Sequence, residues 1–206
     1  MDPRFRGDDN TPMKKLAIFV SGNGTNMENL IVESFNGRIP AQIGFVLTDN
    51  PQAGAIAKAE NYGARVEIVD RKAFKTKTEF ETAIIKQLEI SPVDYIVLAG
   101  FMRILSPEFV RKYKGKIINI HPSLLPVFPG AHSIRDAFEA KVQETGVTVH
   151  FVDEGIDSGQ IILQKKISVA PEETLETLEA KIHAVEYEIY PEALRKVLKR
   201  EVKFSG

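Results

Sequence analysis

Short apolar runs alternate with longer stretches of mixed polarity along the first 120 residues of the chain. The runs are too short for one-sided helices, and they are rich in the β-branched and aromatic residues that favour strands. KLAIFV, at 15–20, is typical of a strand that is buried on both faces. The same pattern predicts further strands at 41–49, 64–69, 94–100 and 116–120.

The stretches between these runs place apolar residues at helical spacing. A predicted helix over 77–90 has one apolar face, which is formed by Phe80, Ala83, Ile84 and Leu88. Two further helices are predicted, one beginning near Asn26 and one over about 52–61. Strands that alternate with helices predict an α/β domain with a Rossmann-like, mostly parallel twisted sheet flanked by helices.

The pattern changes after residue 120. A short helix is predicted from about Ser133, followed by strands at 146–152 and 160–169 and by a last helix from near Thr174. The two strands are close in sequence, so we expect them to be antiparallel and to extend the sheet. Pro191 falls inside the last helix and is expected to kink or divide it.

No repeat, low-complexity tract or linker divides the chain, so a single domain over 14–206 is the simplest organisation. Residues 1–13 are charged and contain Gly and Pro, with no apolar core. We expect them to form a disordered extension rather than a signal peptide.

Composition narrows the classes of function. The 206 residues carry 27 Lys and Arg against 28 Asp and Glu, and this balance indicates neither a nucleic-acid nor a membrane partner. The chain has no cysteine, which excludes disulfides, thiolate nucleophiles and cysteine-ligated zinc. No apolar run approaches the roughly 20 residues that span a bilayer. We therefore expect a cytoplasmic protein.

Glycines mark the turn after the first strand, where the sequence reads SGNGTN (21–26). Gly22 and Gly24 allow the backbone to turn sharply and to approach a ligand. Thr25 and Glu28 have the spacing of a capping box, so a helix is predicted to begin here with free amide groups. Such a helix start can bind a phosphate, although many Gly-rich loops are only tight turns. The loop matches neither the dinucleotide fingerprint nor a P-loop, so NAD and ATP are not indicated.

An unusual polar pair follows the fifth predicted strand, in NIHPSLLPVFPG (119–130). Asn119 and His121 share one face of that strand, and Pro122 keeps His121 extended. Asn can donate a hydrogen bond to a developing oxyanion, and His can transfer a proton near neutral pH. We therefore interpret the pair as catalytic rather than as loop hydrogen bonding.

Three acidic residues lie in the turn DEGIDSGQ (153–160), between the last two predicted strands. One of them, Asp153, Glu154 or Asp157, could orient the histidine or favour its charged, protonated form. Acidic residues in such turns are usually turn formers, and spacing alone does not choose among the three.

Ligands of open α/β sheets bind beyond the carboxyl ends of the strands. SGNGTN, LAGFMRIL (98–105) and NIHPSLLP all follow predicted strands, so we expect them to border one cleft. Thr148 and His150 share a strand face that could line it, although solvent exposure is the simpler expectation. Glu186 falls inside the apolar stripe of the last helix, where a carboxylate should be paired or functional.

The motifs together are similar to the glycinamide ribonucleotide formyltransferase family. The resemblance rests on NIHPSLLPVFPGAHS and GVTVHFVDEGIDSGQIILQ, and on SGNGTNMENLI, VLAGFMRILS and AVEYEIYPEAL in the same order. It covers nearly all of 14–195. It implies transfer of a formyl group from 10-formyltetrahydrofolate to the amine of glycinamide ribonucleotide, without a metal ion, by a monomer or homodimer.

The same resemblance implies roles for individual residues. Asn119, His121 and Asp157 match the family's catalytic trio, which selects Asp157 from the three acids. Substrate contacts are implied for Gly22, Asn23, Gly24, Thr25, Asn26 and Glu186. Folate contacts are implied for Arg103, Ile104, Leu105, Asp153, Glu154, Gly155 and Ile156. The role of His183, which departs from the family pattern, stays open.

Other functions remain alternatives at this point. A deformylase and a methionyl-tRNA formyltransferase share the formyl-transfer core, but they are expected to carry an additional domain. A non-catalytic folate- or nucleotide-binding module would not require an intact proton-transfer trio.

Overall fold

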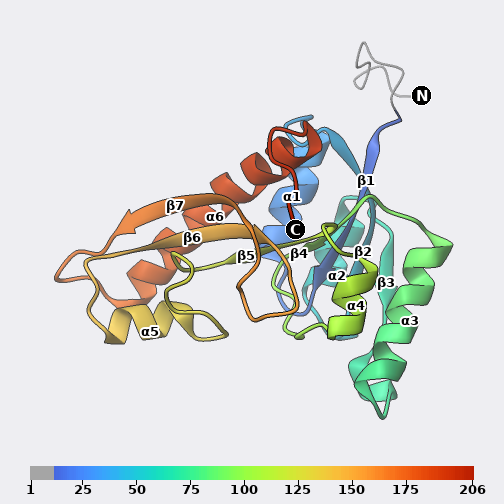
Figure 1. Ribbon diagram of the computed structural model, residues 1–206, viewed down its shortest axis with the longest axis horizontal. Helices are drawn as coiled ribbons and strands as arrows, with labels where there is room; N and C mark the ends of the chain where they lie inside the picture. The colour runs from blue at the N-terminus through green and yellow to red at the C-terminus, as the bar shows by residue number, and fades with distance from the viewer. Residues whose placement is uncertain (1–11) are drawn as a thin grey trace.

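The computed structural model describes residues 12–206. The disordered extension predicted for residues 1–13 lies almost entirely outside the described residues. One seven-stranded sheet crosses the described part, with the strand order β3-β2-β1-β4-β5-β6-β7 (Figure 1). Its strands are β1 (Lys14–Val20), β2 (Ala41–Thr48), β3 (Val66–Ile68), β4 (Tyr95–Leu98), β5 (Ile117–His121), β6 (Glu144–Phe151) and β7 (Ile161–Ser168).

The sheet has a parallel part and an antiparallel part. Neighbouring strands from β3 through β5 are parallel. β6 and β7 continue the sheet in antiparallel pairs and extend away from the parallel part (Figure 1). This arrangement confirms the predicted fold class, including the late antiparallel strands.

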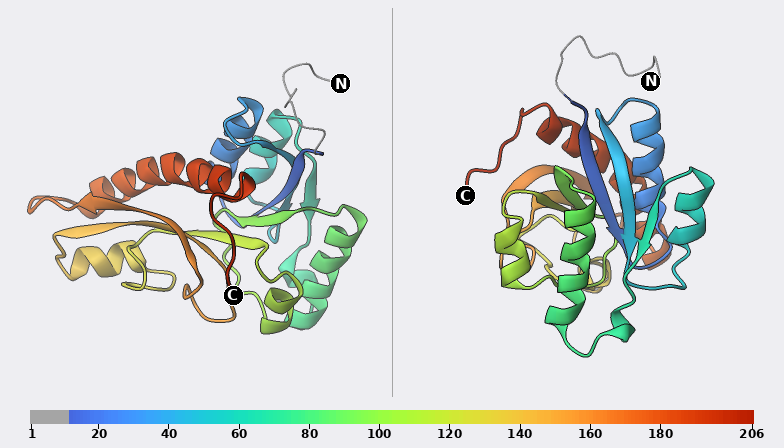
Figure 2. Two further views of the ribbon diagram at one scale, coloured as in Figure 1. Left: turned by 45° about the horizontal axis from the view of Figure 1, so that its top comes forward. Right: turned by 90° about the vertical axis from the view of Figure 1, so that its right-hand side faces the viewer.

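Helices cover both faces of the sheet (Figure 2). α1, α2 and α6 contribute to the core on one face, and α3 and α4 contribute to the core on the other. No described helix is long and apolar enough to cross a membrane. The helices are α1 (Thr25–Phe35), α2 (Ala55–Asn61), α3 (Lys77–Ile90), α4 (Pro107–Lys112), α5 (Ser133–Glu139) and α6 (Leu175–Leu198), with a short 3-10 helix η2 (Arg71–Ala73).

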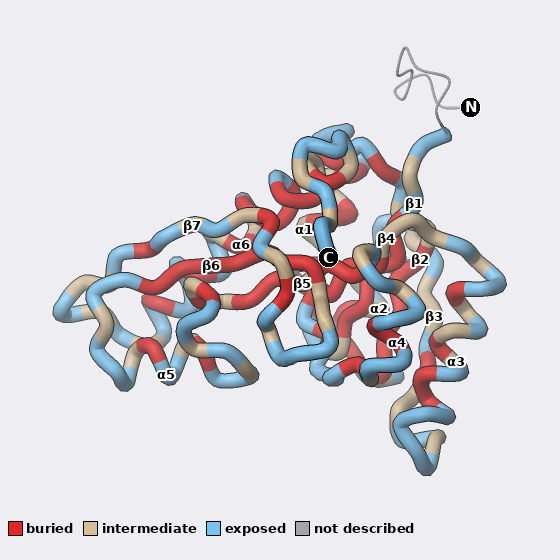
Figure 3. The backbone as a smooth tube through the Cα atoms, in the orientation of Figure 1, coloured by how far each residue is buried: buried red, intermediate tan, exposed pale blue. Residues whose placement is uncertain are grey.

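The central strand β1 separates two hydrophobic cores. Leu16, Ile18 and Val20 belong to the core under α1 and α6, whereas Ala17 and Phe19 belong to the core under α3 and α4. Successive side chains of a strand point to opposite faces, so an uninterrupted apolar run fills both cores. Figure 3 shows the result, with burial concentrated along the middle strands.

Sequence reasoning missed the short elements α4 and η2, and it made β3 too long. The signal for α4 was present, because Ser106 caps the helix and Pro107 occupies its first turn. The Ser106 hydroxyl accepts a hydrogen bond from the Phe109 amide at 3.1 Å. Within residues 12–206, β3 is an edge strand that pairs only with β2, and its ladder covers Val66–Ile68.

Pro191, which was expected to kink or divide the last helix, does not divide it, since α6 runs through it as one helix. Proline has no amide hydrogen, so the carbonyl of Tyr187 loses its usual donor within the helix. Asn29 on α1 replaces that donor, and its Nδ2 lies 2.8 Å from the Tyr187 oxygen. A neighbouring helix thus satisfies the group that the proline leaves free.

Candidate active site

Two of the predicted motifs meet where the parallel strands β1 and β4 end. The Ser21 amide donates to the Gly100 carbonyl at 3.0 Å, and the Met102 amide donates to the Ser21 hydroxyl at 2.8 Å. The next strand, β5, pairs directly with β4, with Leu98 opposite Asn119. The SGNGTN, LAGFMRIL and NIHPSLLP segments therefore follow one another along the same edge of the sheet.

The first loop turns through Gly24, which has φ of 72°. A Cβ at this position would lie 2.6 Å from the Cβ of Ala55, so a side chain would collide with α2. Gly24 is itself the N-cap of α1, and the predicted Thr25 capping box is wrong. The Glu28 carboxylate instead pairs with Lys58 at 3.0 Å. Since a glycine cannot cap with a side chain, the amides at the start of α1 stay open.

These open amides define a possible anion contact. Within residues 12–206, the N–H groups of residues 22–26 donate no hydrogen bond to the protein. The first N–H groups of any helix lack a partner inside the helix, and together they carry a partial positive charge. This is the environment that a phosphate prefers.

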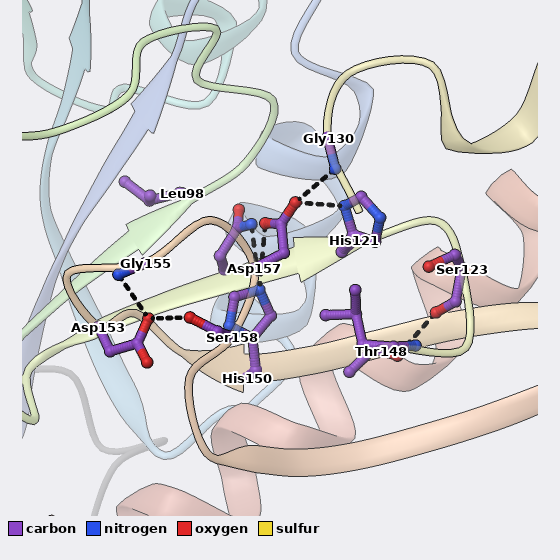
Figure 4. A network of polar contacts seen from close by, with 12 residues as sticks. Leu98, His121, Ser123, Gly130, Thr148, His150, Asp153, Gly155, Asp157 and Ser158 are labelled. Carbon is purple, nitrogen blue, oxygen red and sulfur yellow. Dashed lines mark hydrogen bonds and ion pairs between the residues drawn. The ribbon is translucent and has the colours of Figure 1, made fainter. Parts of the chain in front are cut away.

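A polar cluster lies at the end of β5, where antiparallel pairing with β6 places Asn119 opposite His150. Asp157 reaches the cluster from the β6–β7 turn (Figure 4). Its Oδ2 is 3.4 Å from Nδ1 of His121, and its Oδ1 is 3.7 Å from Nε2 of His150. The Gly130 amide donates to Asp157 Oδ2 at 2.9 Å. Three distant parts of the chain are thereby brought together.

The hydrogen bonds of the two histidines indicate where their protons lie. Nδ1 of His150 faces the Phe151 carbonyl at 2.9 Å, and Nε2 of His121 faces the Phe128 carbonyl at 2.8 Å. A carbonyl can only accept, so each of these nitrogens carries a hydrogen. Burial lowers the pKa of His150 and favours its neutral form.

Neutral His150 then orients Asn119. Its unprotonated Nε2 accepts from Asn119 Nδ2 at 3.3 Å, and the second amide hydrogen of Asn119 remains available. His121 Nδ1 and Asp157 Oδ2 face each other as two acceptors, which a single proton can bridge. The cluster combines a fixed amide donor with a histidine–carboxylate pair suited to moving one proton.

Thr148 supports the prolyl loop instead of joining the cluster. Its hydroxyl donates to the Ser123 carbonyl at 2.7 Å and accepts from the Leu125 amide at 3.1 Å. Gln164 donates to the same hydroxyl at 2.8 Å and to the Leu125 carbonyl at 2.9 Å. Thr148 and His150 are both buried, so the expectation of solvent exposure is wrong for both residues.

Glu186 is buried in α6 and is paired, as its place in the apolar stripe predicted. It is only 4% exposed. Its Oε2 accepts from Asn26 Nδ2 at 2.9 Å and lies 2.9 Å from His183 Nδ1. Asn26 Oδ1 is also buried, and it has no hydrogen-bond partner among the described residues. A buried acceptor without a donor marks a place where a ligand N–H or O–H would be favourable.

The segment after β4 divides between surface and core. Ile104 is 71% exposed, whereas Leu105 is buried in the core beneath α3 and α4. Arg103 lies partly at the surface, and its Nε donates to Asp49 Oδ2 at 2.5 Å. Sequence reasoning missed Asp49, a buried carboxylate directly after β2. Its position after an apolar strand run was the available signal.

The remaining acidic residues of the β6–β7 turn are engaged elsewhere. Asp153 accepts from the Gly155 amide at 3.1 Å and from Ser158 Oγ at 2.8 Å, as turn-forming aspartates do (Figure 4). Glu154 pairs with Arg111 at 2.5 Å. Ile156 is exposed. Of the three acids, Asp157 is the one placed beside His121.

No group of three or more His, Asp or Glu side chains in the described part of the chain is arranged to hold a metal ion. The polar groups of the site are individual hydrogen-bond donors and acceptors. They lie at one edge of an α/β sheet whose two faces are covered by helices.

Comparison with known proteins defines the class of protein to which this chain belongs. Residues 14–194 match the model of the formyl transferase family, so the chain belongs to that family.

Particular relatives within the family are also similar. The chain is 44% identical over 186 residues to a phosphoribosylglycinamide formyltransferase of Bacillus subtilis, covering 90% of this chain and 95% of the relative. A crystal structure of phosphoribosylglycinamide formyltransferase from Bacillus halodurans superposes with a TM-score of 0.88 at 43% identity, covering 92% and 97% of the two chains. A glycinamide ribonucleotide transformylase from Symbiobacterium toebii superposes with a TM-score of 0.91 at 36% identity, covering 94% and 92%.

Proposed function

We propose that this protein transfers the formyl group of 10-formyltetrahydrofolate to the amine of glycinamide ribonucleotide, a step of purine biosynthesis. The observation that carries the proposal is the cluster of Asn119, His121 and Asp157 at the end of β5. Membership of the formyl transferase family implies a formyl-folate co-substrate. The names of the similar proteins support the amine acceptor.

The cluster supports a direct transfer. The substrate amine attacks the formyl carbon and forms a C–N bond, and the formyl oxygen becomes an oxyanion. The free N–H of Asn119 donates to that oxyanion, and protonated His121 stabilises the same charge. Asp157 accepts the amine proton, directly or through water. As the C–N bond to the folate breaks, its nitrogen receives a proton from His121. No covalent enzyme intermediate is needed.

The two substrates have separate candidate contacts. The open amides of residues 22–26 suit the phosphate of the ribonucleotide. Asn26 and Glu186 present acceptors for N–H or O–H groups of the ribonucleotide. The charge of Glu186 favours hydrogen-bond donors of the substrate at this place.

The segment 103–105 and the turn 153–156 are proposed for the folate. Arg103 is held by Asp49 through Nε, and among the described residues its terminal guanidinium nitrogens have no hydrogen-bond partner, so they can donate to a ligand. Exposed Ile104 and Ile156 can provide apolar contact. Leu105 lies in the core beneath this segment and would support it by packing. Asp153 shapes the turn that Gly155 completes.

One assay tests the proposal. The purified protein is mixed with 10-formyltetrahydrofolate and, in parallel, with glycinamide ribonucleotide, methionyl-tRNA or no acceptor. Formylation of glycinamide ribonucleotide in large excess over the other reactions is expected. Faster formylation of methionyl-tRNA, or hydrolysis that is independent of an acceptor, would contradict the proposal. Folate binding without turnover would indicate a binding module.

A further inference from the structure

The end of the chain, residues 201–206, is bound by the turn that carries Asp157. We name these residues the C-terminal segment; Figure 2 shows it in dark red where it leaves the end of α6. Gln160, the last residue of the turn, holds the segment with both atoms of its side-chain amide. Its Nε2 donates to the Lys203 carbonyl at 2.9 Å. Its Oε1 accepts from the Ser205 amide at 2.8 Å and from the Ser205 hydroxyl at 3.0 Å.

Phe204, between these two partners of Gln160, fixes the segment by packing. Its ring lies 5.4 Å from the ring of Phe151 at an angle of 73°, the edge-to-face arrangement that aromatic pairs favour. Phe151 is the last residue of β6 and is buried. Gly115 leaves room for the same ring, because a Cβ there would lie 2.9 Å from a ring carbon of Phe204. The C-terminal segment is thus held at the point where the turn leaves β6.

Close backbone contacts connect this point to Asp157. Phe151 and Gln160 close the base of the turn, where the Phe151 amide donates to the Gln160 carbonyl at 2.9 Å. The backbone of Gly159 lies against Phe151, since a Cβ on Gly159 would come within 1.8 Å of the Phe151 oxygen. Only Ser158 separates Gly159 from Asp157. A displacement at Gln160 would therefore reach Asp157 through a short and closely packed piece of chain.

The backbone of Asp157 needs such support. Its φ of 51° lies in the left-handed region, which is uncommon for residues other than glycine. Residues in sparsely populated regions persist where the surrounding structure determines their conformation. The first half of the turn is closed by the hydrogen bonds of Asp153 to Gly155 and Ser158. Gln160 provides the corresponding anchor at the other end.

We propose that Gln160 and the C-terminal segment are positioning elements for the reaction, which hold the turn so that the Asp157 carboxylate stays directed at His121. The inference rests on the proposed function. Gln160 acts through Asp157 and touches no reacting atom. Its contribution therefore belongs to the chemical step, whereas the loop 21–26, proposed for the ribonucleotide phosphate, lies after a different strand and keeps its structure.

The first measurement compares the steady-state kinetics of the wild type and Gln160→Ala. The substitution removes the hydrogen bonds of an incompletely buried side chain, so the fold should be retained. A misplacement of about 1 Å at a reacting group can cost about 10²-fold, and the first half of the turn keeps its own bonds, so kcat is expected to fall about tenfold. The KM for glycinamide ribonucleotide should stay the same. An unchanged kcat, or a KM that rises as far as kcat falls, would overturn the inference.

The second measurement asks whether Gln160 acts through Asp157. In the background of Asp157→Asn the proton acceptor is already lost, so Gln160→Ala should lower kcat by less than about twofold further. Deletion of residues 203–206 removes the partners of Gln160 and should lower kcat at least as far as Gln160→Ala does. Adding Gln160→Ala to the deletion should then change little, because both changes remove the same contact. Multiplicative losses in either combination would overturn the inference.

The third measurement reads the position of Asp157 at the Gly130 amide, which donates to Asp157 Oδ2. Hydrogen exchange of this amide, followed by NMR, should be faster in Gln160→Ala than in the wild type; equal rates would overturn the inference. Leu88→Ala, in the core on the other face of the sheet, is the control for stability alone. It should lower stability more than Gln160→Ala, yet leave kcat and the Gly130 exchange unchanged. An equal fall in kcat would show that lost stability explains the effect.

The outcomes also separate this inference from the proposed function. A wild-type enzyme that formylates glycinamide ribonucleotide, with an unchanged kcat in Gln160→Ala, would overturn the positioning role alone. A wild-type protein without that activity would overturn the proposed function, and with it the catalytic part of this inference.

Discussion

The parallel and antiparallel parts of the sheet present different chemical groups at the same edge. At the end of β1, the chain turns through Gly24 into α1 and exposes backbone amides. At the end of β5, the chain presents side chains, because β6 returns alongside it and sets Asn119 opposite His150. Parallel strands need a crossover, usually a helix, which supplies a helix N-terminus. Antiparallel neighbours instead bring pairs of side chains into register.

This difference predicts two kinds of sensitivity. A site of backbone amides should depend on the path of the chain and should affect binding when it is disturbed. A site of paired side chains should depend on the identity of single atoms and should affect the chemical step. Variants in the two parts should therefore separate KM from kcat.

The largest effect is expected at Asp157. Asp157→Asn keeps the size of the side chain and an oxygen for the Gly130 amide, but it removes the proton acceptor beside His121. A loss in kcat of about 10²-fold or more is expected, with little change in either KM. Asp153→Asn and Glu154→Gln serve as controls from the same turn, and each should lower kcat only slightly.

The two residues of the proton-moving pair should also act as a unit. Asp157→Asn combined with His121→Asn is expected to cost much less than the product of the two single losses in kcat. Multiplicative losses would show that the residues act independently. An Asp153 effect as large as that of Asp157 would contradict the choice among the acids.

The next largest effect is expected at Gly24. Gly24→Val places a side chain against Ala55 and strains a residue with φ of 72°. The path of the loop should change, and the KM for the ribonucleotide should rise on the order of tenfold or more, far beyond any change in the folate KM.

Gly63 supplies a control for backbone strain alone. It has φ of 69°, but a Cβ there would meet nothing within 4 Å. Gly63→Val should lower stability through strain alone, by less than Gly24→Val does, and should leave both KM values unchanged. If Gly24→Val raised the two KM values equally, the phosphate assignment would be wrong.

A smaller effect is expected for the loop support at Thr148. Thr148→Val keeps the shape of the side chain but removes the hydroxyl bonded to Ser123 and Leu125. The free energy of unfolding should fall by about 2 kcal/mol, because buried backbone groups lose their partner. Denaturant unfolding measures the change. Thr82→Val, on an exposed part of α3, should change stability far less; equal losses would refute the support role.

The smallest effect concerns pH and His150. Its pKa is lowered in the folded state, so protonation favours unfolding once the pH falls below the ordinary histidine value of about 6.5. Between about pH 6.5 and 5, the wild type should lose stability more steeply than His150→Gln, whose side chain does not titrate. Above about pH 7.5 the two slopes should agree. Parallel curves throughout would mean that His150 is not held neutral.

The local pattern of apolar and polar residues was sufficient to predict much of this molecule. The apolar run of β1 predicted a strand that is buried on both faces, and both cores receive its side chains. The shared direction of Asn119 and His121 followed from strand geometry and Pro122. The Ser106–Pro107 start of α4 carried a readable signal that was missed.

Other features depended on residues distant in sequence. The helix α6 continues through Pro191, and Asn29 on α1 supplies the donor that the Tyr187 carbonyl would otherwise lack; nothing near Pro191 in the sequence encodes that contact. The cap of α1 is Gly24 rather than Thr25, and position 24 requires a glycine because Ala55 lies against the turn where a Cβ would project. Asp49 was overlooked because its partner Arg103 belongs to another strand end.

The sequence by itself determined the order of strands and helices, their buried faces and the strand-end motifs, because hydrophobic period and turn chemistry act over a few residues. Only the tertiary structure decided which polar groups meet. Asp153 and Asp157 are the same residue type in the same turn. Asp153 nevertheless accepts from the Gly155 amide within the turn, whereas Asp157 reaches His121. Contacts between distant segments depend on how strands pair and helices pack, and no short stretch of sequence contains that information.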